Sequence, residues 1–181
     1  MKLREHDVFV TAPPSPGWGG RYWILVKVTT DDGIVGWGEC YASSVGPKAM
    51  HVVINDVFER HMMGENPENI EIMFRRVYSS GYTQRPDLTV MGAFSGLEIA
   101  CWDILGKARN RPVHALIGGL VNERIRAYTY LYPLPQHDFA KFWSSPEMAA
   151  EAALDCAERG YTAIKFDPAG PYTLRGGHMP A

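Results

Sequence analysis

A lysine and an aspartate lie two residues apart in a short apolar stretch near the end of the sequence. Residues 162–167 read Thr-Ala-Ile-Lys-Phe-Asp and are predicted to form a strand. Because side chains alternate along a strand, Lys165 and Asp167 share one face, while Ile164 and Phe166 share the other. In a barrel the apolar face packs against helices, which places the two charged side chains inside, at the strand end where barrel active sites are built.

Burying two charges is costly unless they meet a substrate, a metal or each other. We therefore predict that Lys165 and Asp167 are catalytic residues. A purely structural ion pair between them is the alternative that the residues themselves leave open.

Three further residues are candidates for substrate contacts. Trp18 lies in the Gly- and Pro-rich loop 13–20, which predicts either a mobile lid with an apolar tip or a surface turn with a buried tryptophan. Tyr41 follows a predicted strand and could reach a ligand. His178 follows Asp167 in a loop rich in proline and glycine. We predict that Trp18, Tyr41 and His178 bind substrate.

The histidines and cysteines indicate no metal site within these residues. No two of the six histidines stand at the spacing of a ligand pair. Cys40, Cys101 and Cys156 are odd in number, far apart and outside any CxxC array, which argues against both a disulfide framework and a zinc site. A reducing, cytoplasmic location is expected.

The first part of the chain predicts strands followed by helices. Strands are expected at Val8–Val10, Arg21–Thr30 and Ile34–Glu39, and the Asp-Gly turn before the last one is typical of an antiparallel hairpin. Apolar residues at helical spacing then predict helices over Pro47–His61, from Asn66-Pro67 onward, and over Thr89–Arg109.

The second part predicts one β-α-β unit, the building block of parallel sheets and barrels. Strands are expected at Ile125–Tyr132 and Tyr161–Asp167. The helix between them should begin at Ser144 with Glu147 in a capping box, and Gly160 should close it.

Composition excludes several classes of protein. Eighteen Lys and Arg against twenty Asp and Glu give a net charge of −2 over 181 residues, which provides no basic surface for nucleic acid or membrane. No apolar run approaches the roughly 18 residues of a membrane span, and the charged N-terminus is unlike a secretory signal. We expect a small-molecule substrate, no nucleic acid, no membrane, and a homo-oligomer.

Several motifs resemble a known group of enzymes. Residues 32–39, Asp-Gly-Ile-Val-Gly-Trp-Gly-Glu, are similar to the opening hairpin of mandelate racemase and muconate lactonizing enzyme relatives. Residues 93–107 resemble their signature helix, and residues 116–119 and 126–128 continue the match. The resemblance implies the enolase superfamily, with an α+β capping domain at 1–118 and the start of a (β/α)7β barrel at 119–181. It also implies Mg²⁺, which stabilises the enediolate formed by proton abstraction next to a carboxylate.

Within that superfamily the sequence resembles acid-sugar dehydratases of the galactonate dehydratase kind, through residues 64–67, 118–121 and 164–167. Racemases and cycloisomerases of the group usually carry Lys-x-Lys where this chain has Lys165 and Asp167. This departure implies that a histidine from a later strand takes the proton. Lys165 would then be a cation near the substrate carboxylate, and Asp167 a polar partner or substrate contact.

The resemblance implies a dehydratase that converts a sugar acid into a 2-keto-3-deoxy acid. A racemase or cycloisomerase is the alternative within the superfamily, and a non-catalytic binding or assembly module is the alternative outside it. A complete barrel needs about 250 residues, so we expect this sequence to hold only its first strands. The metal ligands and the histidine base are expected in later strands.

Overall fold

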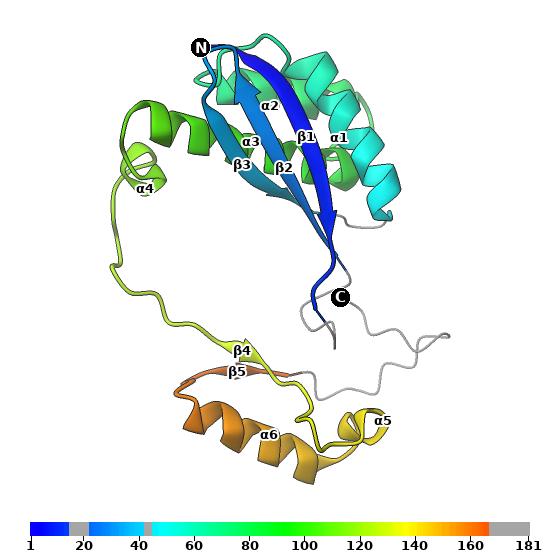
Figure 1. The fold of residues 1–181 in the computed structure, drawn as a ribbon. Helices are drawn as coiled ribbons and strands as arrows, with labels where there is room; N and C mark the ends of the chain where they lie inside the picture. Colours follow the sequence, from blue (N-terminus) through cyan, green and yellow to red (C-terminus); the bar gives the residue numbers. More distant parts are fainter. Residues whose placement is uncertain (15–21, 42–44, 167–181) are drawn as a thin grey trace. The chain divides into compact units, whose positions relative to one another are not determined.

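The computed structural model describes residues 1–14, 22–41 and 45–166. The chain divides into two units, Met1–Leu120 and Val121–Ala181, and each is described by itself (Figure 1).

The first unit opens with the predicted antiparallel meander. The strands β1 (Leu3–Thr11), β2 (Trp23–Thr30) and β3 (Val35–Cys40) pair in the order β1-β2-β3. Gly33, in the turn between β2 and β3, has a φ of 86°, a left-handed conformation that favours glycine.

β1 is longer than the predicted strand Val8–Val10. It pairs with β2 from Leu3, opposite Thr30, to Thr11, opposite Trp23. The polar residues at positions 4–7 hide this strand from the apolar pattern. The backbone of residues 5–7 nevertheless pairs with β2, after an irregularity in the register at Arg4.

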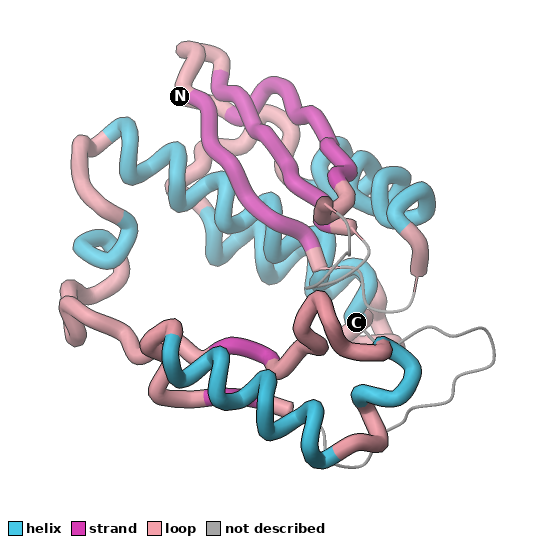
Figure 2. The backbone as a smooth tube through the Cα atoms, turned by 60° about the horizontal axis from the view of Figure 1, so that its bottom comes forward, coloured by secondary structure: helices cyan, strands magenta, loops and turns pink. Residues whose placement is uncertain are grey.

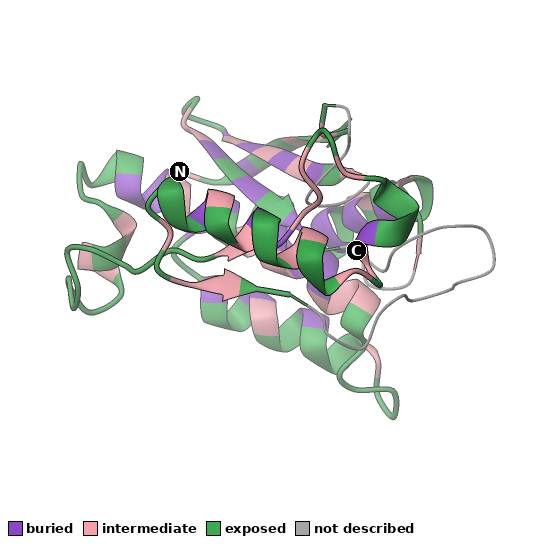
Figure 3. Cartoon of the chain, turned by 90° about the horizontal axis from the view of Figure 1, so that it is seen from below, coloured by how far each residue is buried: buried purple, intermediate pink, exposed green. Residues whose placement is uncertain are grey.

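One face of the sheet is covered by helices, and the alternation predicted for β2 is confirmed. Ile24, Val26 and Val28 are buried, whereas the residues between them are more exposed (Figure 3). The helices α1 (Pro47–His61) and α3 (Leu88–Ala108) pack on this face, and α2 (Ile70–Ser80) packs against these two helices. The short helix α4 (Val113–Leu116) follows (Figure 2).

The start of α2 differs from the prediction. The side chain of Asn66 accepts a hydrogen bond from the backbone N–H of Glu68 at 3.0 Å, and its carbonyl accepts one from Asn69 at 2.9 Å. These bonds close a turn, so the Asn-Pro pair ends a loop and the helix begins at Ile70. α3 starts where a true cap is present, because Asp87 accepts from the N–H groups of Thr89 and Val90.

α3 lies directly on β3, backbone against backbone. A Cβ placed on Gly38 would overlap the carbonyl oxygen of Gly96, and one placed on Gly36 would overlap that of Ala100. A Cβ on Gly96 would in turn lie 2.8 Å from the backbone nitrogen of Cys40. Glycines on both elements are therefore needed for this close contact.

Side chains of α3 also satisfy the free edge of β3. Asp103 accepts a hydrogen bond from the backbone N–H of Trp37 at 2.9 Å, and Lys107 donates to the carbonyl oxygen of Val35 at 2.8 Å. Asp103 and Lys107 also pair with each other at 2.6 Å, one helical turn apart. An edge strand with unpaired backbone groups is prone to association, and these two side chains occupy some of those groups.

Within the described residues, α3 is the one helix long and apolar enough to cross a membrane by length and composition. Half of its apolar window is buried inside the first unit. Core helices of folded domains pass the same test, so this feature is weak evidence for a membrane.

The second unit contains the predicted β-α-β arrangement. β4 (Thr129–Tyr130) and β5 (Ile164–Lys165) pair in parallel, and between them in sequence lie α5 (Phe139–Phe142) and α6 (Pro146–Glu158). Figure 2 shows α6 running along the two strands.

Both strands are shorter than predicted. Only Thr129 and Tyr130 of Ile125–Tyr132 pair, with Ile164 and Lys165. N-terminal to Thr129, a side chain joins the two segments in place of backbone pairing. Arg126 donates to the hydroxyl of Thr162 at 2.9 Å and to the carbonyl oxygen of the same residue. The alternation of apolar residues therefore located both strands, but it did not predict how many residues form backbone pairs.

The cap of α6 is Ser145, and not Ser144 as predicted. The hydroxyl of Ser145 accepts from the N–H of Met148 at 3.3 Å and donates to the carboxylate of Glu147 at 3.0 Å. Hydrogen bonds from the backbone N–H of Glu147 and from the Ser145 hydroxyl lower the pKa of the Glu147 carboxyl group. Pro146 then occupies the first helical position, which shifts the start by one residue.

Replacing Gly38 with alanine should destabilise the full-length protein by about 2–3 kcal/mol, because α3 and β3 must separate to admit the methyl group. Gly46→Ala is the matched control, since a Cβ there meets no atom within 4 Å; it should cost less than about 1 kcal/mol. Urea unfolding midpoints measure both effects. Equal midpoints for the two variants would contradict the close contact.

The thiols of Cys40 and Cys101 should resist alkylation in the folded protein. Burial raises the pKa of each to about 12, so very little reactive thiolate is present at pH 8. Iodoacetamide labelling, read by peptide mass spectrometry, should modify either residue only after denaturation. Labelling of native Cys40 at the rate of the unfolded chain would refute this packing.

Candidate functional site

The candidate site is the face of the β4–β5 pair that carries Lys165. The register places Tyr130 directly opposite Lys165, and paired residues on neighbouring strands project to the same side. The Nζ atom of Lys165 lies 5.8 Å from the centroid of the Tyr130 ring. The ring of Tyr132 lies 5.4 Å from that of Tyr130, at an interplanar angle of 35°.

The backbone beneath this face is fixed by the parallel ladder. Leu131 donates its N–H to the carbonyl oxygen of Lys165 at 2.8 Å, and Thr129 donates to that of Ala163 at 3.4 Å. The positions from which the tyrosine and lysine side chains extend are therefore held by hydrogen bonds between the strands.

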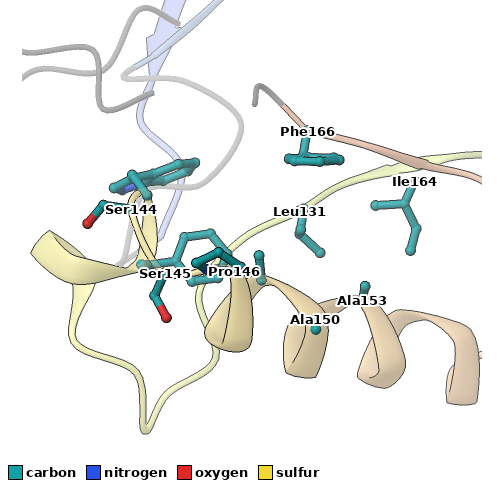
Figure 4. A pocket seen from close by; sticks show the side chains of 11 residues that line it. Leu131, Ser144, Ser145, Pro146, Ala150, Ala153, Ile164 and Phe166 are labelled. Atoms are coloured by element: carbon teal, nitrogen blue, oxygen red, sulfur yellow. The ribbon is translucent and has the colours of Figure 1, made fainter. Parts of the chain in front are cut away.

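The opposite face is apolar and packs toward α6. Leu131, Ile164 and Phe166 point to the helix (Figure 4). This confirms the predicted alternation for residues 164–166, with Lys165 on the other side. Phe166 remains 54% exposed.

A pocket of ≈ 710 Å³ lies between these apolar side chains and α6 (Figure 4). Its lining carries no charged side chain. Of its polar groups, the hydroxyl of Ser145 already caps α6, and the indole N–H of Trp143 is buried without a partner in the described part of the chain. Such a lining offers packing surface but no acid or base for catalysis.

The other predicted site residues are distributed as follows. Asp167, Trp18 and His178 lie outside the described residues. Tyr41 follows β3 directly, and its side chain is 68% exposed in the first unit. Its backbone is pinned to α3, because its N–H donates to the carbonyl oxygen of Gly92 at 3.3 Å.

Tyr130 and Tyr132 are the residues that sequence reasoning missed. A usable signal was present, since both lie at alternate positions of the predicted strand Ile125–Tyr132, where period two places them on one face. Their relation to Lys165 needed the register between the strands, which the sequence alone does not give.

The buried histidine of the second unit has a structural role. His137 accepts from the N–H of Leu134 through Nδ1 at 3.2 Å, so its Nε2 carries the proton and donates to Glu151 at 3.0 Å. Both ring nitrogens are engaged in joining the loop to α6, which leaves neither available as a base.

No group of three or more His, Cys, Asp or Glu side chains could hold a metal ion within residues 1–14, 22–41 and 45–166. The described residues therefore do not by themselves fit a magnesium site. Lys165 takes part in none of the ion pairs found within these same ranges.

Comparison with known proteins gives consistent matches. Residues 18–118 match the N-terminal domain of the mandelate racemase / muconate lactonizing enzyme family. A D-galactonate dehydratase family member from Streptomyces bingchenggensis is 31% identical over 159 residues, which are 88% of this chain and 34% of that protein. D-galactonate dehydratase from Klebsiella pneumoniae is 35% identical over 109 residues, 60% of this chain and 28% of that protein.

A solved structure of a mandelate racemase/muconate lactonizing enzyme from Sulfitobacter sp. is 81% identical with a TM-score of 0.91, and covers 100% of this chain. The chain spans 46% of that protein and about a third of the curated relatives. The meander with its helices is the N-terminal domain of this fold, and the β-α-β unit is consistent with the start of the barrel. The chain therefore belongs to the mandelate racemase / muconate lactonizing enzyme family of the enolase superfamily, and its relatives include galactonate dehydratases.

Proposed function

We propose that this chain, as part of its full-length protein, belongs to an acid-sugar dehydratase. A proton leaves the carbon next to the substrate carboxylate, the hydroxyl on the next carbon departs as water, and the resulting enol becomes the ketone of a 2-keto-3-deoxy acid. Two observations support this choice over racemisation. The curated relatives cited above carry dehydratase names, and the sequence has Lys165 and Asp167 where racemases of the group usually have two lysines.

The observation that carries the proposal is the position of Lys165. Its ammonium group lies on the face of β5 opposite α6, next to an aromatic ring and outside the ion pairs of the described residues. A cation in that place attracts a substrate carboxylate. Because negative charge grows on the carboxylate as the α-proton leaves, the same cation stabilises the transition state more than the bound substrate.

The remaining site residues have supporting roles in this proposal. Asp167 hydrogen-bonds substrate or orients Lys165, while Trp18, Tyr41 and His178 contact the substrate and exclude water. Magnesium, when bound, supplies stabilisation of the enediolate. Its ligands and the base that takes the proton are assigned to parts of the protein other than the described residues.

The proposal is tested with the full-length protein, Mg²⁺ and a panel of sugar acids. Formation of a 2-keto acid supports it. Exchange or inversion at the α-carbon without loss of water would instead identify a racemase, and binding without chemical change would identify a non-catalytic module. Either result would overturn the dehydratase assignment.

Lys165→Ala should lower turnover about a hundredfold or more, equivalent to roughly 3 kcal/mol of transition-state stabilisation. The melting temperature should change little, because Lys165 is in none of the ion pairs of the described residues and its removal leaves none of those charges unpaired. Lys141→Ala is the matched control, since Lys141 is an exposed lysine of the same unit. Steady-state kinetics and thermal melting of both variants provide the measurement.

Asp167→Asn separates the catalytic role from a structural ion pair. If Asp167 only hydrogen-bonds substrate, Asp167→Asn should lower turnover less than Lys165→Ala does. If Asp167 orients Lys165, the two variants should lose turnover to a similar extent. A drop in melting temperature in both variants with turnover preserved would favour the structural pair. Unchanged turnover in Lys165→Ala would rule out its catalytic assignment.

A further inference from the structure

To bind a substrate carboxylate, the ammonium group of Lys165 must be held in position while its positive charge stays available. A lysine side chain is a flexible stem with a mobile charge, so a site that uses it must restrict it. A carboxylate partner would restrict it but would also compete with an incoming substrate carboxylate. An aromatic ring face attracts a cation through its quadrupole and leaves the net positive charge in place.

We propose that Tyr130 is the positioning residue for Lys165. This inference rests on the proposed function, because it assigns Lys165 to the substrate carboxylate. The 5.8 Å between Nζ and the ring centroid is within the range of a cation–π contact. The contact follows from the fold, since the two residues are register partners on adjacent strands.

Tyr132 completes the arrangement from the same strand face. Its ring lies 5.4 Å from that of Tyr130, which is within the range of favourable aromatic pairs. The ladder bonds on either side, from Thr129 and Leu131, fix the backbone from which Tyr130 extends. The ring is thus held by its neighbour and its strand, and it can in turn restrict the lysine.

The test uses three variants of the full-length protein. Tyr130→Phe keeps the ring face, Tyr130→Leu removes it, and Tyr128→Leu is a matched control at a tyrosine that is 60% exposed two residues earlier. Tyr130→Leu should lower kcat/KM about tenfold, the size expected for loss of a partly shielded cation–π contact. Tyr130→Phe and Tyr128→Leu should stay within about twofold of wild type.

A double-mutant cycle separates positioning from a general structural effect. In the Lys165→Ala background, Tyr130→Leu should cause no further loss, because the side chain it positions is gone. An equal tenfold loss in both backgrounds, or an unchanged kcat/KM in Tyr130→Leu, would overturn the proposal.

A second readout does not depend on catalysis. The rate at which trinitrobenzenesulfonate modifies Lys165, followed by peptide mass spectrometry, should rise at least about twofold in Tyr130→Leu, because the ring no longer covers the amine. Modification of Lys141 should not change. If the wild-type protein dehydrates no sugar acid but the labelling rate responds, the proposed function fails and the Tyr130–Lys165 contact stands. If the protein is an active dehydratase and the labelling rate does not respond, the positioning role fails alone.

Discussion

The closeness of α3 to β3 is the constraint on which the first unit depends. Gly36 and Gly38 on the strand and Gly96 on the helix let the two backbones approach to a distance that no Cβ would allow. Because the helix lies so near, Asp103 and Lys107 can reach around to the free edge of the strand. The same contact sets which face of the meander is buried, since the other helices pack on the side that α3 occupies.

The packing of α3 also holds the backbone at the end of β3. Tyr41, the residue that follows β3, donates its backbone N–H to the carbonyl oxygen of Gly92 in α3. In the second unit the parallel ladder has the corresponding role, because it places Tyr130 beside Lys165. In both units, backbone hydrogen bonds determine the position from which a candidate site side chain extends.

Local patterns predicted much of the fold. The meander, α1 and α3 follow from turn residues and from apolar spacing, because each is stabilised mainly by one buried face. The errors arise where pairing decides the structure. The polar start of β1 forms a strand because its backbone pairs with β2. Ile125–Tyr128, by contrast, is predicted as part of a strand but has no backbone pairing within the described residues. For the site, the period-two rule placed Lys165 correctly opposite Ile164, but the contact with Tyr130 depends on register, which no local pattern contains.

The proposed function requires that Lys165, held over Tyr130, binds the carboxylate of a sugar acid. A crystal structure of the full-length protein with Mg²⁺ and a slowly turned-over sugar acid tests this most directly. We expect Nζ of Lys165 to lie within hydrogen-bond distance of the substrate carboxylate, with the ring of Tyr130 beneath the ammonium group. A carboxylate bound elsewhere, with Lys165 directed away from the substrate, would contradict it.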